Sequence, residues 1–380
     1  MDIELNDEQK MLQEMVQKLS REKIVPMLPE LKKNETFSPE LLELLKKNGL
    51  LSILVPEDFG GPGGGVVSAC IVSEELGKVY PAALGILAGP YLTTEFILAG
   101  GTKETQEKYL TQLVRGEIFL ASSLTESEAG SDAASIKSRA VKDGDDYIIN
   151  GVKQFTTGGG IADVYCVFAK TDMEKGYGGI SAFMVNADTD GLTIGKKEDM
   201  MGMRGMQTTE VIYEDVRVSK DNMLGPEGKG FYIAMEGFDH SRPFCGAHAV
   251  GLAQGAFDHA VRYAKERVTF GKPIAQHQAI QFMLADMATE IEAARALVYK
   301  TAVMCDTKAK DVSKFASMAK YFATDMAMKV TTDAVQIFGG YGYMKDYPVE
   351  SYMRDAKVTQ IFDGTNQIHR MVVAANILKG

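Results

Sequence analysis

The order of hydrophobic periodicities along the chain is the feature that most limits its possible folds. Up to Gly116, apolar residues recur with helical spacing. Short β-branched and aromatic runs such as YIIN, GISAFMVN and TEVIYEDVRV follow, separated by Gly, Asp and Asn turns. From Gly230 the helical period returns and holds almost to the end. This order predicts an α+β multidomain fold with an N-terminal helical domain (1–118), a middle antiparallel β domain (119–228) and a C-terminal helical bundle (229–380).

Polar and special residues mark several expected helix ends. Asn6 is the expected N-cap of a first helix that Pro26 ends. Ser38 caps a second helix, and Thr102 caps a later helix that stops at Gly116. The segment FGGPGGG after the second helix is interpreted as a turn between helices, and the alternative is one wall of a ligand pocket.

Composition favours a soluble globular enzyme. Apolar residues make up 45% of the 380 residues and charged residues 24%, and the length suits two or three packed units. The net charge of -10 argues against a nucleic-acid partner. We expect no apolar run of the roughly 18 residues that a membrane span needs, and the N-terminal MDIELNDEQK is acidic and helical in character rather than a signal peptide. Widely spaced cysteines among apolar neighbours predict buried free thiols and a cytoplasmic location: Cys70, Cys166, Cys245 and Cys305.

The stretch from Val335 to Met371 is the most distinctive motif, VQIFGGYGYMKDYPVESYMRDAKVTQIFDGTNQIHRM. It resembles the C-terminal signature of the flavin-dependent acyl-CoA dehydrogenases, in which a carboxylate just before Gly-Thr removes the substrate's α-proton. The resemblance extends over essentially the whole chain. It implies that family's fold with a C-terminal four-helix bundle, FAD as cofactor, no metal, an acyl-CoA substrate, an electron-transferring flavoprotein as partner and a homotetramer.

The same resemblance assigns roles within IFDGTNQ. Asp363 is the implied catalytic base, at a position where most of the family has Glu. Gly364 would contact the substrate, and Thr365 and Gln367 the cofactor.

The segment LTESEAGSD offers backbone N–H groups and hydroxyls to an acceptor-rich ligand, although such a loop standing alone is usually a turn. It is similar to the family's segment along the pyrimidine side of the flavin. The implied cofactor contacts are Leu124, Thr125, Gly130 and Ser131, and Ser131 would also touch the acyl-CoA. Ser-Glu replaces the commoner Pro-Gly inside it.

The segment NGVKQFTTGGG predicts a hairpin turn at Asn150-Gly151, a short strand and a glycine cluster. In the resembling family this stretch lies against the isoalloxazine ring. Phe155 would stack on the ring and Thr157 would donate toward N5. Most relatives have Trp at the position of Phe155, and the smaller ring leaves more room.

The segment FDHSRP places Asp239 and Arg242 three residues apart, which suits an ion pair on one helix. In the resembling family this helix lines the CoA and acyl channel, and Asp239, Ser241 and Arg242 match substrate contacts. A minority branch carries its base here as a Glu just before the Arg. Ser241 occupies that position, so Asp363 has no rival.

Two further segments, ERVTFGKPIAQHQ and QIFGG, are weak evidence alone and would ordinarily be solvated loops. An Arg there could neutralise a pyrophosphate where a Gly lets the backbone approach. By resemblance they reach the adenosine diphosphate of a flavin held mainly by a neighbouring subunit, which implies an obligate oligomer. The implied contacts are Arg267, Thr269, Phe270, Gln278, Gln336, Gly339 and Gly340; His277 is given no chemical role.

Asp in place of Glu bears on the substrate. The shorter side chain withdraws the carboxylate by roughly 1.5 Å, and such a misplacement can cost on the order of a hundredfold in rate unless the substrate compensates. A cyclic acid has a crowded, tertiary α-carbon, and the shorter base together with the smaller Phe155 would make room for its ring, so we expect a cyclic substrate such as cyclohexane-1-carbonyl-CoA. The alternatives are a straight short- or medium-chain acyl-CoA, a flavoprotein of the same fold that does not oxidise its CoA thioester, and a silent binding protein.

Overall fold

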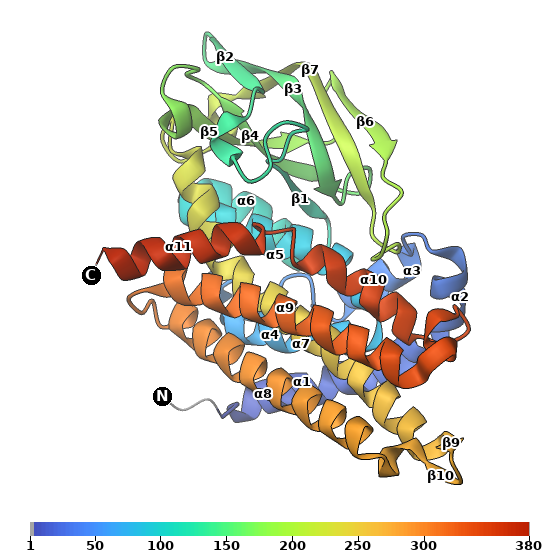
Figure 1. Ribbon diagram of the computed structural model, residues 1–380. Helices are drawn as coiled ribbons and strands as arrows, with labels where there is room; N and C mark the ends of the chain where they lie inside the picture. Colours follow the sequence, from blue (N-terminus) through green and yellow to red (C-terminus); the bar gives the residue numbers. More distant parts are fainter. Residues whose placement is uncertain (1–3, 380) are drawn as a thin grey trace.

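A computed structural model describes residues 4–379, so residues 1–3 and 380 at the ends of the predicted first and last domains lie outside it. The prediction of an acidic, helical N-terminus for residues 1–10 can therefore be compared with the structure only for residues 4–10. The N-terminal part is helical, as expected, and lies beneath the sheet in the view of Figure 1. Its helices are α1 (Asp7–Leu19), α2 (Val25–Asn34), α3 (Pro39–Lys47), α4 (Gly65–Val79), α5 (Leu84–Gly100) and α6 (Lys103–Val114).

The predicted caps are confirmed. The Asn6 side chain accepts a hydrogen bond from the third backbone N–H of α1. The Ser38 hydroxyl does so for α3 and the Thr102 hydroxyl for α6, and Gly116 follows α6 with φ +68°. Each side-chain oxygen satisfies an N–H that has no partner within its helix.

The prediction that Pro26 ends the first helix is wrong. After α1 the chain passes through one π-helical turn (Ser20–Ile24) directly into α2. Pro26 lies in the first turn of α2, where a missing N–H costs little. The helix ends instead at Glu35, which is left-handed with φ +48°. The glycine-rich loop before α4 is a connection between helices, as the first interpretation held.

The middle part is one eight-stranded sheet in the order β6-β7-β3-β2-β4-β5-β8, with β1 paired to β4. Most pairs are antiparallel as predicted, but β1 and β2 pair with β4 in parallel. The strands are β1 (Leu120–Ser123), β2 (Arg139–Asp143), β3 (Asp146–Thr157), β4 (Val164–Lys170), β5 (Ile180–Asn186), β6 (Leu192–Lys197), β7 (Thr208–Ser219) and β8 (Met223–Leu224).

The hairpin turn predicted at Asn150-Gly151 is also wrong. The β2–β3 turn lies at residues 144–145, where Gly144 has φ +65°. Asn150 and Gly151 lie inside β3, at a shift in its register with β7. The Asn150 amide and Asp215 hydrogen-bond each other there at 2.9 Å, as at a β-bulge, which uses the same residue types as a tight turn.

The C-terminal part is a helical bundle, and Figure 1 shows its long helices α7, α8 and α9 running beside one another below the sheet. Buried alanines along α7 and α9 let these helices approach closely. The helices are α7 (Gly230–Glu266), α8 (Gln278–Asp306), α9 (Val312–Phe338), α10 (Val349–Thr359) and α11 (Asn366–Leu378); a small ribbon, β9 (Val268–Thr269) and β10 (Lys272–Pro273), follows α7.

One helical stretch, Pro81–Gly100, has the length and mean hydropathy (1.4) that could cross a membrane, so the expectation that no segment reaches those limits is wrong. In this structure 78% of that window is buried inside the protein. Its apolar surface is therefore used in packing, notably against α7 and β1. The prediction for the cysteines is confirmed, because all four are buried free thiols.

Candidate functional site

The turn between α10 and α11 presents Asp363. Asp363 has φ +54° and Gly364 has φ +92°, so two successive residues are left-handed. Asp tolerates this conformation better than most residues, and Gly adopts it freely. Thr365 then caps α11, because its hydroxyl accepts a hydrogen bond from the Ile368 N–H at 3.4 Å. The sequence DGT therefore suits a sharp turn that starts a helix.

The carboxylate of Asp363 faces α7. Ser241 Oγ lies 2.9 Å from both of its oxygens, and Cys245, one turn further along α7, also hydrogen-bonds to it. Burial raises the pKa of Asp363 from 3.8 to about 6, against the opposing positive charges of Arg242 and Lys320. The site thus holds a carboxylate that can exchange a proton near neutral pH.

Arg242 and Lys320 surround this carboxylate with positive charge. Arg242 is buried and forms the predicted ion pair with Asp239 three residues before it, which is confirmed. Lys320 of α9 has no exposed area, and its Nζ donates to the Gly364 carbonyl oxygen at 2.8 Å. Lys320 was not predicted from the sequence, although it lies in the alanine-rich buried face of its helix.

A buried ion pair holds the loop of residues 124–131 against β3. Lys153 Nζ donates to Glu126 Oε1 at 2.7 Å and to the Leu124 carbonyl oxygen at 3.0 Å. The Gln154 N–H donates to the Thr125 carbonyl oxygen at 2.8 Å. This ion pair was not predicted from the sequence either. A Lys at a position of β3 that faces the buried side could have indicated a buried acidic partner.

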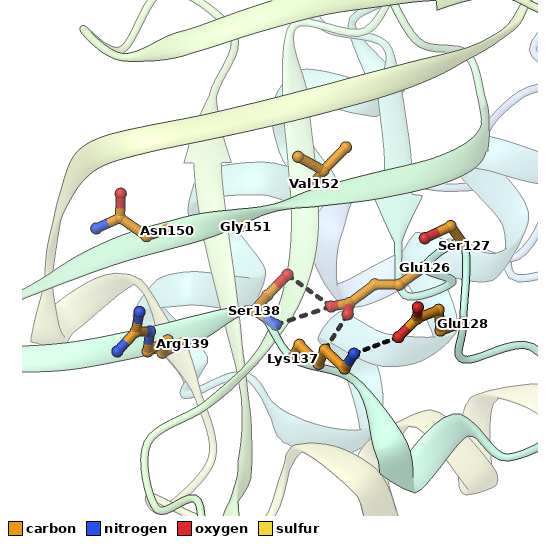
Figure 2. Close-up of a pocket in the computed structure, with 9 residues that line it drawn as sticks. All are labelled: Glu126, Ser127, Glu128, Lys137, Ser138, Arg139, Asn150, Gly151 and Val152. Carbon is orange, nitrogen blue, oxygen red and sulfur yellow. Dashed lines mark hydrogen bonds and ion pairs between the residues drawn. The ribbon is translucent and has the colours of Figure 1, made fainter.

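Figure 2 shows the other contacts of Glu126, whose carboxylate accepts hydrogen bonds from Ser138 and from the Lys137 backbone N–H. These residues line an open cavity of about 310 Å³. Gly130 and Ser131 of the same loop are exposed. The loop is thus fixed at Glu126 and open at the positions predicted to contact ligand.

Phe155 lies at the second register shift of β3, with φ +56° and 59% of its surface exposed. Thr157, two residues on, pairs with Thr208 of β7 and is half-buried. An exposed aromatic ring on a strained backbone, beside the loop of residues 124–131, fits a flat aromatic group such as the isoalloxazine of FAD.

The two segments predicted to reach adenosine diphosphate come together. The Arg267 guanidinium lies over the Tyr341 ring, 5.6 Å from its centroid, which joins the segment after α7 to the glycine pair 339–340. Thr269 Oγ1 lies 3.1 Å from His277 Nε2, and Phe270 is 96% exposed. Gln278 and Gln336 are exposed beside them, and a Cβ at Gly339 or Gly340 would meet nothing within 4 Å.

This second group lies far from Asp363 within one chain. Ser241 lies in the first third of the continuous helix α7 and Arg267 directly follows its last residue, so the two are 26 positions apart, which corresponds to roughly 39 Å. The chain therefore carries two separate sets of predicted contacts. Gln367, on the first turn of α11, is exposed and stays with the Asp363 set. Within residues 4–379, no group of three or more His, Cys, Asp or Glu side chains could hold a metal ion.

Comparison with known proteins covers the whole chain. Models of the acyl-CoA dehydrogenase N-terminal, middle and C-terminal domains match residues 6–117, 121–216 and 228–378. An acyl-CoA dehydrogenase of Bacillus subtilis is 46% identical over 99% of both chains. A cyclohex-1-ene-1-carbonyl-CoA dehydrogenase of Syntrophus aciditrophicus is 46% identical over 99% of this chain and 91% of its own. A cyclohexane-1-carbonyl-CoA dehydrogenase of Geobacter metallireducens is 44% identical over 98% of both.

Solved structures agree with this fold. Butyryl-CoA dehydrogenase from Megasphaera elsdenii matches with a TM-score of 0.96 and 44% identity over all of both chains. A chain solved in work on the electron transferring flavoprotein of Acidaminococcus fermentans matches with a TM-score of 0.97 and 45% identity over all of both. A Bacillus anthracis acyl-CoA dehydrogenase complexed with FAD matches with a TM-score of 0.92 and 32% identity, over 99% of this chain and 67% of its own. FAD is the family's cofactor. With three domain models in order and relatives matched end to end, the chain belongs to the acyl-CoA dehydrogenase family.

Proposed function

We propose that this enzyme removes the α-proton of an acyl-CoA thioester with Asp363 and so forms the α,β-enoyl-CoA. The observation that carries the proposal is the Asp363 carboxylate itself, partly buried, contacted by Ser241 at 2.9 Å and with its pKa raised to about 6. A base with that pKa is ionised at neutral pH and still strong enough to accept a weakly acidic proton. FAD, when bound, supplies the acceptor for the hydride that leaves the β-carbon.

The chain's own groups then have distinct tasks. The α-proton passes to an oxygen of Asp363, and Ser241 directs that carboxylate. The Asp363 backbone N–H is the proposed donor to the thioester carbonyl oxygen, where negative charge develops as the proton leaves. Asp239, Ser241, Arg242 and Gly364 are the proposed substrate contacts, together with Ser131.

The cofactor contacts are proposed in two sets. Leu124, Thr125, Gly130 and Phe155 would hold the flavin ring within one subunit, together with Ser131, Thr157, Thr365 and Gln367. The set around Arg267 and Gly340, far away along α7, would serve the FAD of a neighbouring subunit. A cofactor shared in this way would require an oligomer, and we propose a homotetramer by resemblance to the family.

The electron acceptor we propose is an electron-transferring flavoprotein, supported by the matched chain from work on such a protein. The two boundaries between the three domains, at residues 118 and 228, stay predictions, as does a cytoplasmic location, which the buried free thiols support.

For the substrate we propose a cyclic acyl-CoA, with cyclohexane-1-carbonyl-CoA as the leading candidate. The shorter Asp363 side chain and the smaller Phe155 ring both make room near the α-carbon. Two relatives at 44–46% identity are named for cyclic acyl-CoA substrates. A straight short-chain substrate is the second candidate, favoured by the match to butyryl-CoA dehydrogenase at 44% identity.

Anaerobic reduction of the bound flavin distinguishes these candidates. The holoenzyme is mixed with equal concentrations of cyclohexane-1-carbonyl-, isobutyryl-, butyryl- and octanoyl-CoA, and the loss of flavin absorbance is followed. Fastest bleaching by the cyclic thioester supports the proposal, and fastest bleaching by butyryl-CoA supports the second candidate. Thioester binding without bleaching by any of them would overturn dehydrogenation itself.

A further inference from the structure

Lys320 is a lysine with no exposed area, in the middle of α9. Its Nζ donates to two neutral oxygens, the Gly364 carbonyl at 2.8 Å and Asn366 Oδ1 at 3.1 Å. Asn366 is itself 98% buried and donates to Asp325 Oδ1 at 2.7 Å. Among residues 4–379, no carboxylate forms an ion pair with Lys320 within 4.0 Å. A buried ammonium group is therefore held by dipoles instead of by a directly paired charge.

Such a charge is costly to bury unless an anion compensates it nearby. The negative groups that favour its charged form are Asp363 and, with less effect, Cys245 and Asp325. Asp325 is already committed to Arg370, whose guanidinium lies 2.6 Å from it. Cys245 is a buried thiol with a raised pKa, so Asp363 is the anion that remains for Lys320.

The other groups around Asp363 are already matched. On α7, Arg242 is paired with Asp239. On α11, burial lowers the pKa of His369 from 6.5 to about 3, so its ring is neutral. Lys320 on α9 is the cation near Asp363 that lacks a carboxylate of its own.

Lys320 also fixes the backbone of the turn. Asp363 is a non-glycine residue at φ +54°, a conformation that must be held by its surroundings. The bond from Lys320 to the Gly364 carbonyl anchors the next peptide group to α9. That anchor sets the direction in which the Asp363 side chain leaves the turn.

We infer that Lys320 is a positioning residue for the base: it clamps the Asp363–Gly364 turn to α9 and supplies the unpaired positive charge that keeps Asp363 ionised. The catalytic meaning of this inference rests on the proposed role of Asp363. The electrostatic interaction between Lys320 and Asp363 does not depend on that role.

The test uses two neutral variants of the holoenzyme, Lys320→Gln, which can still donate to the Gly364 carbonyl, and Lys320→Met, which cannot. Lys329→Met is the matched control, because Lys329 is an exposed lysine on the same helix. Two quantities are followed against pH: the rate of anaerobic flavin reduction and the carboxyl infrared band that disappears in Asp363→Asn. FAD content and thermal unfolding report whether each variant folds.

Both Lys320 variants should raise the midpoint of the Asp363 band by about one pH unit or more, since a nearby opposite charge lowers an Asp pKa by about that amount. The acid limb of the rate should move with it, and Lys320→Met should also lose rate at its own optimum, whereas Lys329→Met should match wild type. An unchanged midpoint in folded, flavin-bearing variants would overturn the inference. Failure of both variants to fold would also overturn it, because Lys320 would then be a residue of the folding core.

A shifted infrared band without any effect of Asp363→Asn on turnover would refute the proposed base and leave the electrostatic link standing. The two failures are therefore distinguishable.

Discussion

Replacing Asp363 by Asn should stabilise the folded protein while removing its activity. Burial raises the pKa of Asp363 from 3.8 to about 6, so the folded state binds this proton more tightly than the unfolded chain does. Stability contributed by this group is present below pH 3.8 and is lost as pH rises through about 6. The full shift corresponds to at most about 3 kcal/mol at pH 7 and above.

An Asn side chain has nearly the same shape and stays neutral, so it avoids this cost, which is already net of the attraction to Arg242 and Lys320 because both charges act on the raised pKa. The variant should exceed wild type by up to about 3 kcal/mol at pH 8 and by well under 1 kcal/mol near pH 4. Urea unfolding at equal protein and FAD concentrations across this pH range measures the difference, because both FAD and subunit association shift apparent stability. An equal difference at all pH values, or a less stable Asn variant at pH 8, would refute a raised pKa at this site.

Two further predictions concern Asp363 and its partner Ser241, and a third concerns the Lys153–Glu126 ion pair. Asp363→Glu advances the carboxylate by roughly 1.5 Å. The ratio of kcat/KM for butyryl-CoA to kcat/KM for cyclohexane-1-carbonyl-CoA should therefore rise by about tenfold or more. An unchanged ratio would contradict a role of side-chain length in substrate choice. Ser241→Ala removes a hydrogen bond to the charged carboxylate and should raise the pKa of Asp363. The acid limb of the pH profile of the flavin-reduction rate should move about one pH unit upward. An unmoved limb would show that Ser241 does not act on Asp363. Lys153→Met leaves the buried Glu126 carboxylate without its ion-pair partner, so it should cost about 3–5 kcal/mol in stability and weaken FAD binding. Release of flavin fluorescence measures the binding, with the exposed Lys142→Met as control. Equal FAD retention in the two variants would show that this ion pair does not support the flavin loop.

The parts of the fold that were predictable depend on signals local in sequence. The change from helical to alternating periodicity separated the sheet from the helices, and the side chains of Asn6, Ser38 and Thr102 marked helix starts because each satisfies its own helix's N–H groups. The Asp239–Arg242 ion pair was predictable for the same reason, since residues three apart share one helix face.

The missed features depend on partners distant in sequence. Pro26 looked like a helix end, but its place in the first turn of α2 depends on the π-helical turn before it. Asn150-Gly151 suits a turn or a bulge equally, and only pairing with β7 selects the bulge. Lys320 lies 44 residues from the Gly364 carbonyl that it contacts, so the residues next to it in sequence could not predict that contact.

The central claim is that Asp363 takes the α-proton, and single-turnover flavin reduction tests it most directly. Wild type and Asp363→Asn, both loaded with FAD, are mixed anaerobically with cyclohexane-1-carbonyl-CoA in a stopped-flow instrument. Wild type should bleach, and the second-order rate constant at low thioester concentration, which reports the free enzyme, should rise with pH through an apparent pKa near 6. The Asn variant should stay yellow although it binds the same thioester. Bleaching of the Asn variant at a rate close to that of wild type would contradict the claim.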